Sequence, residues 1–238
     1  MAKRPIFLPA PDRYRDRYPY AEEKKIEFKW YPGFSLGQAQ RSIRSLHEAA
    51  KEKGIAPVLE ISGKSPSSLG TSLSAFELRL KLPDGKSMSV ECAYQGSKVF
   101  ENGCRYHDLY DVSSREAKTD SRLKNSGDVV AFNFMGKECE IEPQTAFYDW
   151  LYMKALSQKG PSIFEELNRF QAFSDIAFNP KRSINCQARA AAVYVALNQL
   201  ESGVEDLICD WDSFQDLFGD ATQPSSTVND DPQLRFSF

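Results

Sequence analysis

One segment of the chain, VECAYQGSKVF, combines side chains that could carry out acid–base and amine chemistry. If this segment is a helix, it places four polar residues on one face, at positions i, i+3, i+4 and i+7: Glu91, Tyr94, Gln95 and Lys98. Such a face is most often solvated, and the alternative is a ligand site. At 1.5 Å per residue the acid and the amine lie about 10 Å apart along the axis. This distance is too long for an ion pair and suits two long side chains that converge on a small molecule.

The composition narrows the classes of function. The chain has 238 residues and a net charge of −3, so any contact with nucleic acid must come from a local patch. Its two histidines argue against a zinc site or a Ser-His-Asp triad, and we expect no metal and no cofactor. Five cysteines without a CxxC pair fit reduced thiols and a cytoplasmic protein. No apolar run reaches the length of a membrane span, and the N-terminus does not resemble a signal peptide.

The elements that must position the polar face predict an α+β fold. We expect one mainly helical domain over residues 21–218, with a small antiparallel sheet from the N-terminal third. Residues 1–20 are expected to form a flexible basic arm, and residues 219–238 a disordered tail. Periodicity and turn residues predict strands over 24–33, 56–62, 73–82 and 128–136, and helices over 35–53, 90–100, 145–159, 162–173 and 204–219, with a further helix that follows Pro180 and is capped by Ser183.

The expected arm interleaves arginines with tyrosines (Arg13, Tyr14, Arg15, Arg17 and Tyr18). Such a segment could hold the backbone of single-stranded DNA while its rings stack on bases. The alternative is a loosely packed terminus whose aromatic side chains dock on the body of the protein.

Three blocks in order, LSAF (73–76), DGK (84–86) and VECAYQGSKVF, resemble the signature of the NADAR superfamily. The positions that match this signature are Ser74, Phe76, Glu91, Tyr94, Gln95 and Lys98. The resemblance continues more weakly through REAKTDSR and YMKAL to Asn185. The chain departs from the pattern at Ala75 and Cys92, and FNPKRSINCQAR replaces the late W-G block.

Four further segments, FENG, SSREAK, FYDWLY and NPKRSINCQAR, are similar to one branch, the antitoxins of DNA ADP-ribosyltransferase toxins. The resemblance implies a hydrolase, an N-glycosidase that removes ADP-ribose from guanine bases of single-stranded DNA and thereby repairs it. The implied partners are ADP-ribosylated single-stranded DNA, the product ADP-ribose and the cognate toxin. One alternative is an N-glycosidase that acts on phosphorylated ribosylamino metabolites of riboflavin synthesis. Another is a protein that binds ADP-ribose, or the toxin, without catalysis.

Two chemical routes could break the bond between the ribose and the exocyclic amine. In one, two carboxyl groups support an oxocarbenium-like state. In the other, the ribose opens and a lysine captures its carbonyl carbon as a Schiff base. One acid accompanied by one lysine favours the second route, with Lys98 as the nucleophile and Glu91 as the group that moves protons. The lysine must then be partly neutral, which requires burial or nearby cations.

Other residues are candidates for binding the substrate. Ser74 and Phe76 could contact the ribose and the base, although Phe76 could equally belong to a core strand. Tyr94 and Gln95 share the polar face with the two catalytic candidates. We also expect Asn185 to face the site. Asp175 is a candidate second carboxylate.

A second group of candidates depends on the late helices and on the polar loop. Lys181 and Arg182, with Ser183, could hold the pyrophosphate at a helix N-terminus, or they could form a solvated basic turn. Asp149 lies on a helix that resembles a site-lining helix. On the same helix, Trp150 could stack on a flat ring or belong to the core. Tyr106 and Arg115 could meet adenosine or DNA.

Overall fold

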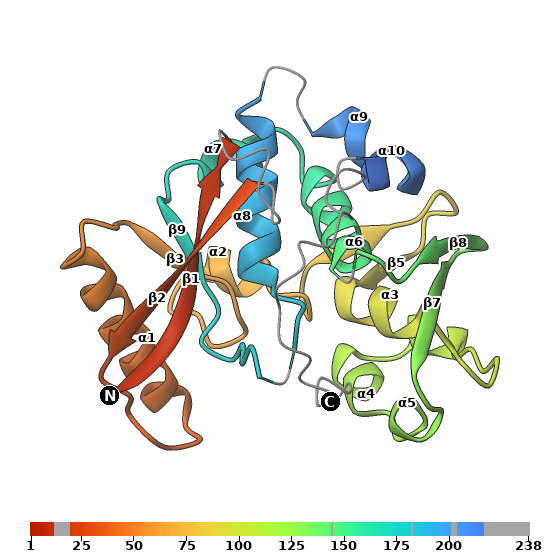
Figure 1. Ribbon diagram of the computed structural model, residues 1–238, viewed down its shortest axis with the longest axis horizontal. Coiled ribbons are helices and arrows are strands. Elements are labelled where there is room, and N and C mark those ends of the chain that lie inside the picture. Colours follow the sequence, from red (N-terminus) through yellow and green to blue (C-terminus); the bar gives the residue numbers. More distant parts are fainter. Residues whose placement is uncertain (12–19, 144, 182, 201–203, 217–238) are drawn as a thin grey trace, which may run out of the picture.

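Three β-sheets with helices packed around them make up the computed structural model of the protein (Figure 1). The structure describes residues 1–11, 20–143, 145–181, 183–200 and 204–216. The expected α+β class is confirmed. The sheets are not confined to the N-terminal third, however, because strands occur from Ala2 to Ser174.

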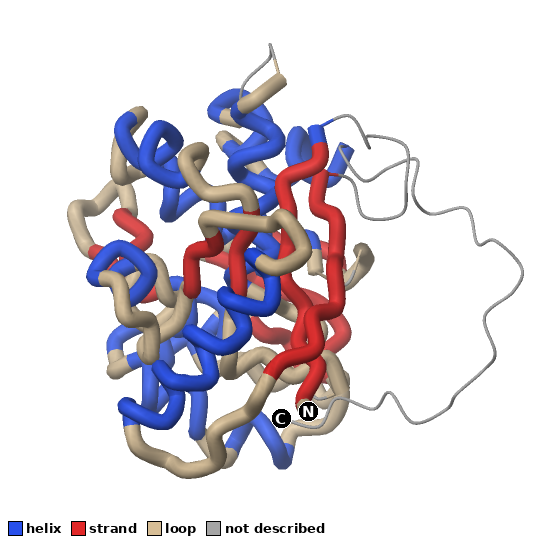
Figure 2. The backbone as a smooth tube through the Cα atoms, turned by 90° about the vertical axis from the view of Figure 1, so that its left-hand side faces the viewer, coloured by secondary structure: helices blue, strands red, loops and turns tan. Residues whose placement is uncertain are grey.

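The largest sheet has four strands in the order β2-β1-β9-β3 and is mixed. These strands are β1 (Ala2–Ala10), β2 (Tyr20–Phe28), β3 (Val58–Glu60) and β9 (Ala172–Ser174). β1 runs antiparallel to β2 and to β9, whereas β3 and β9 are parallel. Figure 2 shows β1 and β2 as two long strands side by side. Because β9 lies between β1 and β3, this sheet joins the start of the chain to its last third.

The flexible arm expected over residues 1–20 is wrong for its first half, because Ala2–Ala10 forms β1. The register with β2 runs without interruption from Ala2 opposite Phe28 to Ala10 opposite Tyr20. Ile6 and Phe7 are buried on opposite faces of the sheet, which explains why this stretch is ordered. Residues 12–19, with the remaining arginines and tyrosines of the arm, lie outside the described residues.

One helix covers each face of this sheet. α1 (Leu36–Lys51) begins after Ser35, whose side chain accepts a hydrogen bond from the backbone of Gln38, much as the sequence predicts. Its inner face packs against the sheet in a cluster that includes Ile6, Ile26, Phe28, Ile43, Leu46 and Ala50. On the other face, α8 (Gln187–Asn198) contacts β1 and β2. Figure 1 shows α1 on the left of the sheet and α8 on its right.

The middle of the chain forms two smaller sheets around a short helix. The hairpin β4 (Arg79–Lys81) and β5 (Ser87–Ser89) leads directly into α3 (Val90–Gly96). The third sheet contains β6 (Lys98–Phe100), β7 (Val129–Phe134) and β8 (Lys137–Glu140). The expected strand over 73–82 shortens to β4, and Phe76, expected to alternate into a core, is 40% exposed.

α6 (Ala146–Ser157) is buried on nearly all sides and packs against α3 and α8. The helix expected over 162–173 is helical only in its first half, because its second half enters β9. Two short helices replace the one expected over 204–219, and the expected tail lies outside the described residues.

The remaining helices are α2 (Ser68–Ser72), the 3-10 helix η2 (His107–Asp111), α4 (Ser114–Thr119), α5 (Arg122–Asn125), α7 (Ser162–Leu167), α9 (Glu205–Ile208) and α10 (Trp211–Asp216). Within the described ranges, no helix has the length and apolarity that a membrane crossing requires.

Candidate active site

Glu91 lies in the first turn of α3, which begins where the β4–β5 hairpin ends. Ser89 fixes this start, because its side chain accepts a hydrogen bond from the backbone N–H of Cys92. The Glu91 side chain is buried, and the residue is only 4% exposed. Its Oε1 accepts a hydrogen bond from Gln95 Nε2 at 2.7 Å and lies 3.1 Å from Lys118 Nζ. An amide one turn along the helix and an ammonium from another helix therefore hold this carboxyl group.

Lys98 does not belong to the helix, contrary to the continuous helix expected for this segment. α3 ends at Gly96, where a Cβ atom would lie 2.5 Å from the ring of Tyr110. The chain then turns at Ser97, whose carbonyl accepts a hydrogen bond from Asn133 N in β7. Lys98 is consequently the first residue of β6, and the sheet, not helical periodicity, sets the direction of its side chain.

The surroundings of Lys98 favour its neutral form. The residue is 3% exposed, and its Nζ lies 5.1 Å from the centre of the Tyr94 ring. Burial lowers the pKa of Lys98 to about 7; the Glu91 charge opposes this shift and the Lys118 charge adds to it. At neutral pH a substantial fraction of the lysine is therefore an uncharged amine, the form that attacks a carbonyl carbon.

Four of the expected substrate-binding residues carry buried polar atoms that have no hydrogen-bond partner in the described part of the chain. They are Ser74 Oγ, Gln95 Oε1, Asp149 Oδ1 and Asn185 Oδ1. The other oxygen of Asp149 is paired with Arg189. Buried polar atoms in native proteins are almost always paired, so such atoms call for a ligand or a water molecule as partner. Gln95 and Asn185, two of these residues, contact Glu91 and Tyr94 directly.

Tyr94 joins the two halves of this site. Its hydroxyl accepts a hydrogen bond from Asn185 Nδ2 at 2.8 Å, which connects α3 to the segment before α8. Its ring packs against Phe132 at 5.5 Å and edge-on against Tyr148 at 5.4 Å, measured between ring centres. Burial raises the pKa of Tyr94, so the phenol stays protonated. Burial raises the pKa of Tyr148, and the Glu91 charge adds to this shift.

Sequence reasoning missed Lys118 and Tyr148. Lys118 lies on α4, which begins with a capping box formed by Ser113 and Glu116. Ser114, also on α4, shares a hydrogen bond of 2.8 Å with Ser89 Oγ, the cap of α3, and this contact sets α4 against α3. The two residues lie in the segments REAKTDSR and FYDWLY, which form part of the resemblance to the family. These segments were the sequence feature that could have pointed to them.

The geometry thus combines a buried acid and a buried, partly neutral lysine with Tyr94, Gln95 and Asn185. A protein-family model described as DarT1-associated NADAR antitoxin matches residues 2–228. The chain belongs to this family. Membership of this family makes the protein a NADAR antitoxin associated with DarT1. A comparison with curated proteins finds no match.

Asp149 and Trp150 of this antitoxin lie in the core. Asp149 Oδ2 accepts a hydrogen bond from Arg189 at 2.6 Å, and both side chains are buried. Trp150 donates to the carbonyl of Ile208 and packs edge-on against Trp211. Of the two alternatives for Trp150, stacking on a ligand or a place in the core, the structure therefore shows the place in the core. Neither residue forms a described contact with Glu91 or Lys98.

The expected anion site at a helix N-terminus is wrong in its geometry. α8 begins at Gln187 and not after Pro180, so Ser183 does not cap it. Lys181 is exposed in a turn, where its N–H donates to Asn179 Oδ1. Arg182 lies outside the described residues.

Of the polar-loop candidates, Tyr106 is held on the surface of the antitoxin. Its hydroxyl hydrogen-bonds to Ser126 Oγ at 2.6 Å, and the Arg122 guanidinium lies 4.6 Å from its ring centre. Arg115 is exposed on α4. Phe76 lies at the surface, and its carbonyl accepts a hydrogen bond from Ser114, so it stays a candidate for contact with the base.

Asp175, the candidate second carboxylate, already has three donors. Its Oδ1 accepts from the backbone of Ala177 and of Phe178, and its Oδ2 from Gln187 Nε2. Burial raises the pKa of Asp175 to about 6, while the Lys118 charge lowers it. These donors suit a carboxylate that anchors a loop beside the site.

Gln187 connects Asp175 to the loop that carries Ser74. Its Oε1 accepts from Ala75 N at 2.7 Å, and its Nε2 also donates to Ile61 O. Beneath it lies Glu60, whose oxygens accept hydrogen bonds from Ser62, Ser174 and Ile176. Burial and the neighbouring Asp175 raise the pKa of Glu60 to about 8, so this acid is protonated at neutral pH.

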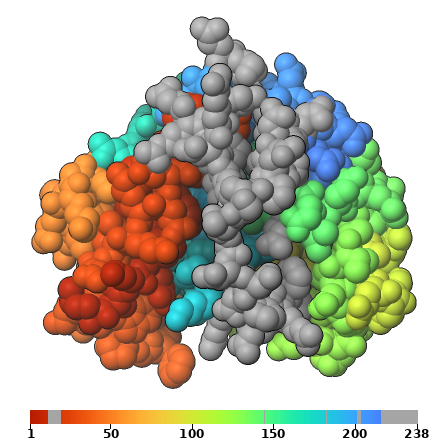
Figure 3. Space-filling view, viewed as in Figure 1, coloured from red at the N-terminus to blue at the C-terminus, as the bar shows by residue number. Residues whose placement is uncertain are grey.

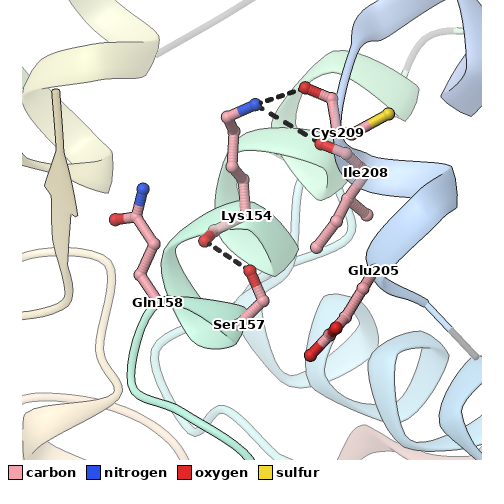
Figure 4. Close-up of a pocket in the computed structure, with 6 residues that line it drawn as sticks. All are labelled: Lys154, Ser157, Gln158, Glu205, Ile208 and Cys209. Atoms are coloured by element: carbon pink, nitrogen blue, oxygen red, sulfur yellow. Dashed lines mark hydrogen bonds between the residues drawn. The ribbon is translucent and has the colours of Figure 1, made fainter. Parts of the chain in front are cut away.

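A shallow pocket lies elsewhere, between α6 and α9 (Figure 4). Its lysine, Lys154, donates to the carbonyls of Ile208 and Cys209, so its ammonium holds α9 in place. None of the residues drawn in Figure 4 belongs to the group around Glu91. In the described ranges, no three His, Cys, Asp or Glu residues are grouped as a metal site.

Replacement of Lys118 by methionine should move the rising limb of the pH–rate profile to higher pH. Burial and the Lys118 ammonium both lower the pKa of Lys98, and without the ammonium the Glu91 charge raises this pKa unopposed by a neighbouring cation. Activity below pH 7 should fall several-fold and recover in more alkaline buffer. The measurement is kcat/KM against pH. Lys118→Arg should keep the wild-type profile, as should Lys124→Met on neighbouring α5. An unshifted profile in Lys118→Met would contradict the assigned role.

Proposed function

We propose that this antitoxin is an N-glycosidase that removes ADP-ribose from guanine bases of single-stranded DNA. The observation that carries the proposal is the buried Lys98, with a pKa of about 7, beside the buried Glu91. A solvated helix face would leave both groups in water with ordinary surroundings. Removing these two ionisable groups from water costs free energy, and a purely structural role would not require their burial.

In the proposed reaction, Glu91 takes up a proton from solvent and delivers it to the ring oxygen as the ribose ring opens. The neutral Lys98 amine then adds to the anomeric carbon, and the exocyclic amine of guanine leaves with a proton. This step breaks the carbon–nitrogen bond to the base and forms a Schiff base between Lys98 and the sugar. Water adds to the Schiff base, the carbon–nitrogen bond to lysine breaks, and free ADP-ribose departs. Guanine stays in the strand, and the amine is regenerated.

The disposition of the other carboxyl groups supports the lysine route over a two-carboxylate route. Asp149 is paired with Arg189 in the core, and Asp175 accepts three hydrogen bonds. Glu91 is therefore the carboxyl group that shares the site with Lys98. The unpaired atoms of Ser74, Gln95 and Asn185 supply donors and acceptors for the hydroxyl groups of the opened sugar.

Incubation of the antitoxin with ADP-ribosylated single-stranded DNA tests the proposal. Chromatography should detect free ADP-ribose, and mass spectrometry of the oligonucleotide should show an intact guanine. Loss of the base together with the sugar would contradict the assigned bond. Phosphorylated ribosylamines serve as the competing substrate, and preferred cleavage of these would favour the metabolic alternative. Binding without release of ADP-ribose from either substrate would favour a non-catalytic antitoxin.

A further inference from the structure

The segment between β2 and α1 exposes aromatic rings on the surface. Phe34 is fully exposed and Trp30 is 39% exposed, and Tyr31 lies beside them, half-buried. Three cations surround these rings. Together, Arg4, Lys29, Trp30, Tyr31, Phe34 and Arg41 form what is called here the cation–aromatic patch.

The cations of the patch lie over its rings. The Arg4 guanidinium is 5.5 Å from the centre of the Trp30 ring. Lys29 Nζ and the Arg41 guanidinium lie 5.1 Å and 5.6 Å from the centre of the Tyr31 ring. Trp30 and Tyr31 thus each combine an apolar ring with a positive charge, and Phe34 adds an exposed ring; this combination suits a stacked base whose phosphate is close by.

The charges of the patch differ from those on the neighbouring hairpin. There, each lysine is paired with a glutamate: Lys3 with Glu27, Lys24 with Glu22, and Lys25 with Glu23. Among the described residues, no carboxylate lies within salt-bridge distance of Arg4, Lys29 or Arg41. The patch is therefore a local positive site on a chain whose net charge is negative.

The patch is held in place by α1. Tyr31 N donates to Ser42 Oγ at 3.0 Å, and the same hydroxyl donates to the carbonyl of Tyr31 at 3.3 Å. Lys29 N donates to Ser45 Oγ at 3.2 Å. Phe28 supports Trp30 edge-on, with 6.2 Å between ring centres. A surface whose rings are ordered before binding loses little entropy when a ligand stacks on them.

We propose that the cation–aromatic patch binds the single strand that flanks the modified guanine. This inference rests on the proposed function and adds a second contact for the same substrate. Single-stranded DNA offers both accessible base faces and phosphates, whereas duplex DNA hides its bases and an acidic protein surface offers no planar rings to stack.

The position of the patch sets the length of strand required. α1 and the N-terminal end of β1 lie on one side of α8, and α3 and α4 lie on the other (Figure 1). In the space-filling view, the red and orange N-terminal part and the green and yellow part form opposite sides of the same face (Figure 3). A strand whose modified guanine lies at Lys98 must therefore extend across the molecule to reach the patch, so a mononucleotide cannot use it.

Binding of unmodified single-stranded DNA tests the patch without any reaction. Fluorescence anisotropy with a labelled oligonucleotide of about 16 nucleotides should give a Kd that rises about fivefold or more in Phe34→Ala. Phe34 is fully exposed, so this change leaves the fold intact. Arg41→Glu should weaken binding further and reduce its dependence on salt. Lys25→Ala, a paired cation, and Val130→Ala, an exposed apolar residue on β7, serve as matched controls that should bind like the wild type.

Kinetics separate this inference from the proposed function. In Phe34→Ala and Arg41→Glu, KM should rise for a long ADP-ribosylated oligonucleotide and stay unchanged for ADP-ribosylated guanosine monophosphate, with the same kcat. Wild-type binding by both variants would overturn the inference while leaving the glycosidase intact. Loss of DarT1 binding with unchanged DNA binding would also overturn it and assign the patch to a protein. Absence of ADP-ribose release from every substrate would defeat the proposed function, and the anisotropy result would still decide the patch.

Discussion

Replacement of Lys98 by methionine is expected to abolish release of ADP-ribose, with kcat reduced by roughly 10⁴-fold or more. Methionine has nearly the length of lysine and suits the buried position, so the fold should persist. What disappears is the amine that bonds to the sugar carbon. In the wild type, kcat should rise with pH through about 7 and then level off, because burial lowers the pKa of Lys98 to about 7 and only the neutral amine attacks.

Two measurements distinguish a nucleophile from a mere positive charge. Borohydride added during turnover should reduce the Schiff base and leave a stable adduct on the peptide that contains Lys98. Lys98→Arg keeps the charge but cannot form this adduct, and it should be as inactive as Lys98→Met. Lys154→Met replaces the other lysine whose pKa burial lowers, at the pocket of Figure 4, and should keep its activity. An active Lys98→Arg variant without an adduct would refute covalent catalysis.

Replacement of Glu91 by glutamine is expected to lower kcat by about 10²–10⁴-fold, the usual effect of losing a general acid or base. The amide preserves the size of the side chain and can still accept the hydrogen bond from Gln95. It cannot carry a proton to the ring oxygen or to the leaving amine. Because the Glu91 charge raises the pKa of Lys98, its removal should also move the rising limb of the pH profile to lower pH. This shift is opposite to the one expected for Lys118→Met.

A buried acid outside the site provides the control for this variant. Glu60 is protonated at neutral pH, since its pKa is raised to about 8, so Glu60→Gln exchanges one neutral group for another. Its kcat at pH 7 should stay within a few-fold of the wild type. If Glu91→Gln were as active as Glu60→Gln, Glu91 would not be the group that transfers protons.

Local periodicity predicted which side chains share the polar face, and the resemblance to the NADAR signature made the acid and its neighbours candidates for the site. Glu91, Tyr94 and Gln95 lie within a single helical segment, where spacing alone fixes which side chains share a face. Lys98 is beyond the end of that helix, because Gly96 allows Tyr110 to pack there and Ser97 turns the chain into β6. The lysine reaches the site through a sheet contact that no helical pattern encodes.

The residues that sequence reasoning missed enter the site through tertiary contacts. Lys118 reaches Glu91 because Ser114 docks α4 on the cap of α3, and Gln187 joins segments that are distant in the chain. The start of the chain, expected to be an arm, is the strand β1 because it pairs with β2 along its whole length and with β9 at Ile6 and Phe7. Pairings of this kind depend on the whole fold and leave little trace in composition or spacing.

The position of β9 has a consequence for synthesis of the protein. β1 and β3 do not pair with each other and belong to one sheet only when β9 (Ala172–Ser174) lies between them. Asn185, which contacts Tyr94, is translated later still. On the ribosome, a nascent chain therefore exposes two unsatisfied strand edges during most of its translation, which invites association with other chains. The candidate site lacks the contact between Asn185 and Tyr94 until translation has entered the last quarter of the chain, so a product that ends before Asn185 would lack this part of the site.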